Sequence, residues 1–186
     1  MSKEFAKGKK GPKGNNPMKT LKRMLAVMLA VVMMMGLGVT SMARETTYTV
    51  KIYLQTATRN ASGVVTGTDK LNSGNPVTVT VNAGTTYADA IDQACATSGS
   101  GISNAVWTGT TDKYLDSLKV GDKTYTNKGS YPNTNTYIGN SWMYFNGEPS
   151  TIPADINSYP DVVLSKATVN GNVTFTLSYE SMIYTW

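Results

Sequence analysis

The stretch Ser141-Trp-Met-Tyr-Phe-Asn-Gly-Glu148 joins a short aromatic segment to an Asn-Gly dipeptide. Asn-Gly at the end of such a segment is the strongest local signal for a tight β-hairpin turn. We therefore predict a strand over residues 141–145 that ends in a tight turn at Asn146-Gly147. On this strand Trp142 and Tyr144 share one face, Met143 and Phe145 share the other, and the pattern leaves open which pair is buried.

Alternating apolar and polar residues predict strands on both sides of this stretch. Residues 47–56, 77–81 and 173–179 all carry apolar side chains at every second position, which is typical of half-buried strands. We expect 77–81 to pair with 47–56. Residues 57–75 are rich in Asn and Gly and predict a long hairpin loop between these two strands.

The period changes from two to the helical 3.6 after Gly84. Tyr87, Ile91, Ala94 and Cys95 recur at helical spacing, which predicts one helix over about residues 86–97. Thr86 is the expected N-cap, with Asp89 three residues later, and Cys95 is expected to be a buried helix residue. Strands, one helix and further strands indicate an α+β fold in which the helix packs across a mixed sheet.

The region between the helix and residue 141 has a weaker pattern. Residues 101–107 and 114–118 are short apolar segments that fit a helical turn or a strand. Residues 124–140 contain few aliphatic side chains, and Pro132 is expected to interrupt any regular element. A loop of this length in a small domain indicates either a functional loop or an unrecognised strand.

Residues 1–43 predict a basic extension followed by a Sec signal peptide. A basic flank precedes a 16-residue apolar run over 24–39, shorter than the roughly 20 residues that span a membrane. Ser41-Met42-Ala43 places small residues where a signal peptidase reads, so cleavage after Ala43 is expected. A retained anchor and translation from Met18 are the alternatives left open. Residues 44–186 then form one domain of a secreted or cell-surface protein.

The charge of the chain depends on this division. The chain holds 17 basic and 12 acidic residues, of which residues 1–43 hold eight and one, so the remaining 143 residues hold nine and eleven. A slightly acidic domain gives no support to nucleic-acid binding through phosphate neutralisation. The chain has no histidine and one cysteine, so the usual acid/base residue is missing and no internal disulfide can form. We therefore expect a protein that is not an enzyme.

Four segments in order resemble a known family. They are Val77–Ile91, with Asn-Ala-Gly-Thr-Thr at its centre, Tyr114–Leu118, Ser141–Gly147 and Gly171–Tyr179. Over residues 46–180 the chain is similar to the bacterial transcobalamin-like C-terminal domain, a domain of unknown function. The resemblance implies a small β-grasp-like module on an exported or surface protein.

The resemblance raises the question of whether cobalamin is a ligand. In the animal transporters the similar domain closes over the corrin together with a large helical barrel. This chain lacks the repeated helical pattern of such a barrel and has no histidine to ligate cobalt. The sequence therefore does not favour cobalamin or any other cofactor.

Two functions from different classes fit these observations. The first is a non-catalytic binding module for a small molecule, glycan or peptide, because aromatic faces with amide partners suit recognition. The second is a structural or adhesive surface protein that assembles through edge strands. Partners would be an extracellular ligand or a surface protein, without nucleic acid, and with membrane contact only through the leader before cleavage. The candidate ligand-binding residues are Trp107, Tyr114, Tyr137, Trp142, Tyr144 and Asn146. Core positions are the alternative for these aromatic residues.

Overall fold

A six-stranded mixed sheet forms the larger layer in the computed structural model, which describes residues 45–185. Strands β1 and β9 run parallel at its centre, and the strand order is β2-β1-β9-β8-β7. β3 pairs with the first half of β1, and β2 pairs with the second half. The strands are β1 (Thr47–Arg59), β2 (Val65–Lys70), β3 (Val77–Asn82), β7 (Lys128–Asn133), β8 (Thr136–Asn146) and β9 (Val173–Thr185). The signal peptide and basic extension predicted over residues 1–43 lie outside the described residues.

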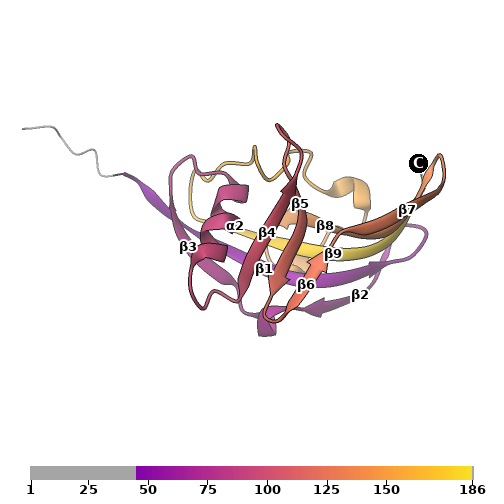
Figure 1. Cartoon of the computed structure of the whole chain (residues 1–186), viewed down its shortest axis with the longest axis horizontal. Coiled ribbons are helices and arrows are strands. Elements are labelled where there is room, and N and C mark those ends of the chain that lie inside the picture. The colour runs from indigo at the N-terminus through magenta and orange to yellow at the C-terminus, as the bar shows by residue number, and fades with distance from the viewer. Residues whose placement is uncertain (1–44, 186) are drawn as a thin grey trace, which may run out of the picture. The chain divides into compact units, whose positions relative to one another are not determined.

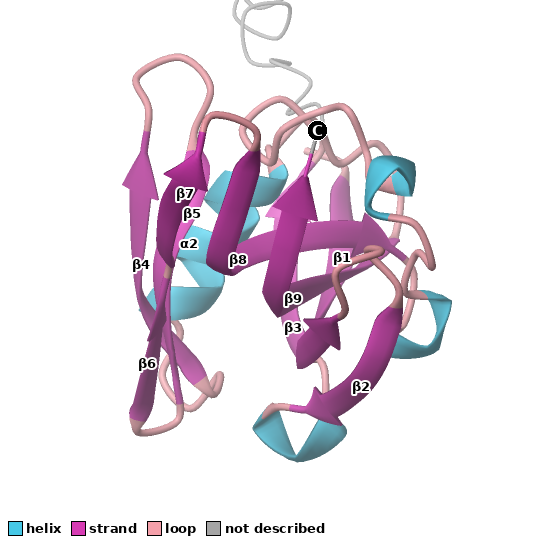
Figure 2. Cartoon of the chain, turned by 90° about the vertical axis from the view of Figure 1, so that its right-hand side faces the viewer, coloured by secondary structure: helices cyan, strands magenta, loops and turns pink. Residues whose placement is uncertain are grey.

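A second layer consists of one helix and a small antiparallel sheet. The helix is α2 (Tyr87–Ala96), and the sheet contains β4 (Ile102–Thr108), β5 (Tyr114–Val120) and β6 (Lys123–Thr126) in that order. Figure 1 shows α2 and this sheet side by side across one face of the six-stranded sheet, and Figure 2 shows the layers from the side. The arrangement confirms the predicted α+β fold with a mixed sheet and one packed helix.

Period-two patterning explains the strands that the sequence predicted. Along β3 buried and exposed residues alternate without exception, and Val50 and Ile52 of β1 are fully buried. β3 pairs with β1 as expected. β9 departs from simple alternation, since Thr176, Ser178 and Glu180 are as buried as Phe175 and Leu177 on the opposite face. Both faces of the sheet are therefore covered at its centre.

The predicted N-cap fixes the start of α2. The backbone N–H of Asp89 donates to Thr86 Oγ1 at 3.1 Å, and the Thr86 hydroxyl donates to Asp89 Oδ2 at 2.7 Å. Both bonds satisfy groups that would otherwise lack partners in the first turn. The buried face of the helix carries Ala90 and Ile91, and its Tyr87 ring stacks on Phe175 with centroids 4.6 Å apart.

The prediction of a tight hairpin at Asn146-Gly147 is wrong. Residues 147–172 separate β8 from β9, and they include two short 3-10 helices, η2 (Pro149–Thr151) and η3 (Ile156–Ser158). β8 nevertheless pairs with β9, and Gly147 N–H donates to Thr174 O at 2.9 Å. Gly147 adopts a φ of 97°, so the dipeptide does redirect the chain. Pairing with the distant strand β9 replaces the hairpin, and a local turn signal cannot predict such pairing.

Two expected loops contain strands. Within 57–75, β1 continues to Arg59 and β2 follows, with a short 3-10 helix, η1 (Asn72–Gly74), after it. Within 124–140 the chain forms β7 and parts of β6 and β8, and Pro132 lies inside β7. Every residue of β7 is exposed, so it shows no alternation, and proline is tolerated on an edge strand whose N–H needs no partner. The segments 101–107 and 114–118 are strands, not helical turns.

Candidate ligand-binding cavity

A cavity of about 170 Å³ lies along the outer edge of β8. Its walls come from β8, from the start of β5 and from the segment 159–164, which follows η3. We refer to it as the β8 cavity. The residues that line it are mostly apolar: Lys113, Tyr114, Leu115, Trp142, Met143, Tyr144, Tyr159, Pro160, Val162, Val163 and Leu164.

Trp142 is the most firmly held aromatic wall of the β8 cavity. Its side chain is only 8% exposed, and its indole N–H donates to the carbonyl of Tyr125 at 3.0 Å. Its ring packs against Tyr125 and Tyr179, with centroids 6.0 Å and 5.2 Å away. Its backbone N–H donates to Asn127 Oδ1 at 2.9 Å. Because both of its N–H groups have protein partners, the Trp142 ring presents a rigid apolar surface to the cavity.

Tyr144 connects the cavity wall on β8 to the wall formed by the segment 159–164. Its hydroxyl donates to the carbonyl of Val162. Burial, and secondarily the neighbouring Tyr87 hydroxyl, raises the pKa of Tyr144 to about 12. The hydroxyl is therefore protonated at neutral pH and acts as a donor.

The backbone of β8 adds polar groups to this otherwise apolar site. In an antiparallel ladder, successive residues turn their N–H and C=O alternately toward and away from one partner. Gly147 bonds to β9, whereas the N–H of Trp142 points to Asn127 and Asn140 pairs with Lys128 of β7. Even-numbered residues thus face away from β9. The N–H and C=O of Tyr144 consequently lie on the outer edge, where the cavity is.

The structure brings three of the six predicted binding residues together and separates the rest. Tyr114, Trp142 and Tyr144 line the β8 cavity. Trp107 packs next to the helix, and its indole N–H donates to Asp92 Oδ1 at 2.8 Å. Tyr137 lies at the far end of β8, where its hydroxyl bonds to Ser141 Oγ at 3.0 Å.

Asn146, the last residue of β8, is exposed and outside the cavity lining. Its carbonyl accepts a bond from Thr151 Oγ1 at 3.3 Å. The amide predicted to act beside the aromatic rings therefore belongs to the turn into η2. The polar groups that do lie next to the aromatic rings of the cavity are the backbone N–H and C=O of Tyr144.

Neither face of β8 proves to be the exposed one. Trp142 is 8% exposed and Phe145, on the opposite face, is 2% exposed. Phe145 packs edge-on against Tyr159, with ring centroids 6.0 Å apart. The segment after η2 covers the face that the helix layer leaves open, so aromatic residues on both faces of β8 contribute to packing.

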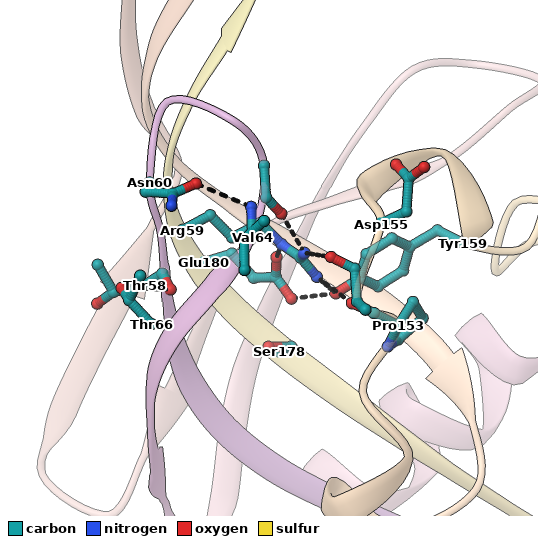
Figure 3. A network of polar contacts seen from close by, with 12 residues as sticks. Thr58, Arg59, Asn60, Val64, Thr66, Pro153, Asp155, Tyr159, Ser178 and Glu180 are labelled. Atoms are coloured by element: carbon teal, nitrogen blue, oxygen red, sulfur yellow. Dashed lines mark hydrogen bonds and ion pairs between the residues drawn. The ribbon is translucent and has the colours of Figure 1, made fainter.

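Sequence reasoning missed a buried polar network beneath this segment, shown in Figure 3. The side chains of Arg59 and Glu180 are fully buried, and Arg59 Nε donates to Glu180 Oε2 at 2.6 Å. The other guanidinium N–H groups donate to the carbonyls of Gly63, Pro153 and Ala154 and to the Tyr159 hydroxyl, at 2.6 to 3.1 Å. All five donors of Arg59 therefore have acceptors.

The network holds parts of the chain together and contains no reactive group. Burial alone would lower the pKa of Arg59, but its bonds to Glu180 and Tyr159 outweigh this and raise it. Burial, followed by the charge of Glu180, raises the pKa of Tyr159, whose hydroxyl donates to Glu180 Oε1. The network joins the turn after β1, the segment 153–159 and β9. It also fixes Tyr159, which lines the β8 cavity.

The remaining reactive groups offer little chemistry. Cys95 is half-buried, and burial raises the pKa of its thiol, which disfavours the thiolate. Among residues 45–185, no three His, Cys, Asp or Glu side chains come together as a metal site. Within the same range, no helix has the length and apolar character that crossing a membrane requires.

Comparison of the chain with protein-family models, with curated proteins and with solved structures finds no match. The resemblance to the transcobalamin-like C-terminal domain therefore stays a prediction.

Proposed function

We propose that this protein is an exported, non-catalytic recognition module that holds one apolar group of its ligand in the β8 cavity. The observation that carries the proposal is a cavity of about 170 Å³ walled by Tyr114, Trp142 and Tyr144. An apolar cavity of about 150 Å³ is large enough to hold benzene. The β8 cavity therefore suits one aromatic ring or one branched aliphatic group.

The lining indicates which ligands fit. Apolar walls with a few fixed polar groups are typical of small-molecule sites, and the backbone N–H and C=O of Tyr144 could orient an amide-like group. A sugar ring is less suited, because its hydroxyls would lose water without gaining partners on Leu115, Val163 and Leu164. A corrin is far larger than the cavity. A small aromatic molecule or an apolar side chain of a peptide fits best.

A non-catalytic role agrees with the chemistry of the lining. Raised pKa values keep Tyr144 and Tyr159 protonated near neutral pH, so neither supplies a general base. Export is the part of the proposal that rests on the leader and on the resemblance to a bacterial transcobalamin-like domain. Intact mass of the mature protein tests it, and a mass that includes residues 1–43 would argue against it.

Assembly through edge strands is the second candidate, because β2 and β7, at the two ends of the strand order, are exposed. All six residues of β7 and five of six in β2 are exposed. However, Lys70, Lys128 and Pro132 on these strands are residue types that protect edges from pairing. Sedimentation over a wide concentration range separates the candidates, since assembly would appear as a concentration-dependent increase in mass.

The proposed site can be tested with benzamide, which combines one ring with an amide. We expect benzamide to shift the NMR methyl signals of Leu115, Val162 and Leu164, with a Kd of about 1 mM, equivalent to about −4 kcal/mol. Acetamide, which lacks the ring, should not bind.

A matched pair of variants locates the binding. Val162 and Val106 are about equally exposed, at 50% and 48%, but only Val162 lines the β8 cavity. Val162→Phe should fill the cavity and weaken benzamide binding at least about tenfold, whereas Val106→Phe should leave it unchanged. Equal binding to both variants, or no binding to the unmodified protein, would exclude the proposed site.

A further inference from the structure

A second hollow lies where the chain crosses from the small sheet to the large one. Its volume is about 290 Å³, and it is bounded by the segment 123–128, which contains β6 and the first residue of β7. β1, β8 and β9 form its other walls. We refer to it as the crossover hollow. Trp142 lines the β8 cavity, and its ring neighbours Tyr125 and Tyr179 line the crossover hollow, so the aromatic cluster separates the two sites.

The walls of the crossover hollow carry many hydrogen-bonding side chains. Thr56, Thr58, Thr124 and Ser181 provide hydroxyls, and Asn140 provides an amide. None of these five side chains has a hydrogen-bond partner within residues 45–185, so their donors and acceptors are available to a ligand. Such a concentration of hydroxyls and an amide matches the hydroxyl groups of a sugar.

The crossover hollow is also positively charged. Lys123 and Lys128 both line it, and no carboxylate is among the lining residues. Neither lysine forms an ion pair in the described part of the chain. The Lys123 ammonium lies 4.7 Å from the centroid of the Tyr125 ring, which holds it near the hollow by a cation–π contact. This charge contrasts with the net negative charge of residues 44–186.

The crossover hollow is held in shape by Asn127, the residue between β6 and β7. Its Nδ2 donates to the carbonyl of Leu115 at 2.9 Å, and its Oδ1 accepts from the Trp142 N–H at 2.9 Å. The Tyr179 hydroxyl donates to Thr126 O at 2.5 Å. These bonds fix the chain next to Lys128, and pairing of β6 with β5 fixes Lys123 opposite Val120, so the site is preorganised and not created by the ligand.

We propose that the crossover hollow binds a carboxylate-bearing sugar, a uronate residue of an acidic glycan. The two lysines can attract a carboxylate, the hydroxyls and the amide match the sugar hydroxyls, and the Tyr179 ring that lines the hollow suits the apolar side of the sugar. The volume is near the lower limit of about 300 Å³ for ligand pockets, which suits one or two sugar rings. Two lysines on a slightly acidic domain do not suit a long polyphosphate chain.

Titration calorimetry with digalacturonate at low salt tests this inference. We expect a Kd of about 1 mM or below, at least about tenfold weaker binding of the neutral galactose disaccharide, and loss of affinity as salt rises. Lys123→Met and Lys128→Met should each weaken digalacturonate binding at least about tenfold. Both lysines are exposed, so these variants should keep the stability of the unmodified protein.

Two control variants separate this site from others. Lys51→Met removes an exposed lysine of β1 that lies outside the crossover hollow, and Val162→Phe fills the β8 cavity. Both should bind digalacturonate as the unmodified protein does. Asn140→Asp places a negative charge in the hollow and should abolish binding.

Four results would overturn the inference. They are absence of heat with digalacturonate at about 10 mM, equal affinity for the neutral disaccharide, insensitivity to both lysine substitutions, and inorganic phosphate binding as tightly as digalacturonate. None of these results bears on benzamide binding in the β8 cavity. The two sites can therefore fail separately.

Discussion

Replacing Glu180 by glutamine should reveal how much the buried network stabilises the fold. The substitution keeps the size of the side chain and removes its charge. Arg59 Nε would still meet an oxygen or an amide group, and its other four N–H groups would keep their acceptors. The guanidinium charge would, however, stay fully buried without a counter-charge. Breaking a buried ion pair by removing one partner costs about 3–5 kcal/mol.

We expect a value near the lower end, about 3 kcal/mol, because Arg59 keeps four hydrogen bonds. A domain of this size has a free energy of unfolding of about 5–15 kcal/mol, so the loss is a large fraction of the total. It corresponds to an increase of about 100-fold in the unfolded fraction. By contrast, the Asp112–Lys166 pair is 45% and 54% exposed, and Asp112→Asn should cost about 0–1 kcal/mol.

Urea unfolding followed by tryptophan fluorescence at pH 7 measures both variants against the unmodified protein. The midpoint should fall clearly for Glu180→Gln and barely for Asp112→Asn, with unchanged slopes. If Glu180→Gln costs no more than Asp112→Asn, the charge is not buried as the structure places it, and the Arg59–Glu180 pair does not stabilise the fold.

Three further predictions concern parts of the fold that position the two sites. Asn127→Ala removes two bonds that join the sheets and should cost about 2 kcal/mol in urea unfolding, whereas a loss below 0.5 kcal/mol would show that Asn127 is not a tie. Thr86→Ala removes the cap of α2 and should cost about 1 kcal/mol, and an unchanged urea midpoint would refute the capping contact. For Tyr144 the folded pKa of about 12 exceeds the ordinary value of 10, so its contribution is complete below pH 10 and is lost as the pH rises toward 12. Stability measured from pH 9 to 12 should therefore fall, and less steeply in Tyr144→Phe; identical curves would contradict this.

The sequence predicted the elements in which apolar residues recur with a regular period. β1, β3 and the helix show clear periods because one face of each meets the core, and the Thr86 cap adds a local signal. β7 has no buried residue, so no period could mark it. The Asn-Gly dipeptide at residues 146 and 147 is a local turn signal. The hairpin that it predicted does not form, because β8 pairs with β9, which follows after 26 intervening residues.

The sequence predicted the candidate site only in part, for a similar reason. Trp142 and Tyr144 lie on one strand face and could be paired from their spacing alone. Tyr114 joins them only because β5 folds over the large sheet, and the segment 159–164 has no period that predicts its place. That segment is positioned by the Tyr144 hydroxyl and by Tyr159. The Arg59–Glu180 pair joins residues 121 positions apart, and only the parallel pairing of β1 with β9 brings them together.

A crystal structure of the protein soaked with benzamide would show whether the β8 cavity binds an aromatic ring. We expect one ring between Tyr114 and Trp142, with its amide bonded to the backbone of Tyr144 and with Val162 in contact. A ring bound at another surface, or a cavity closed by movement of the segment 159–164, would contradict this expectation.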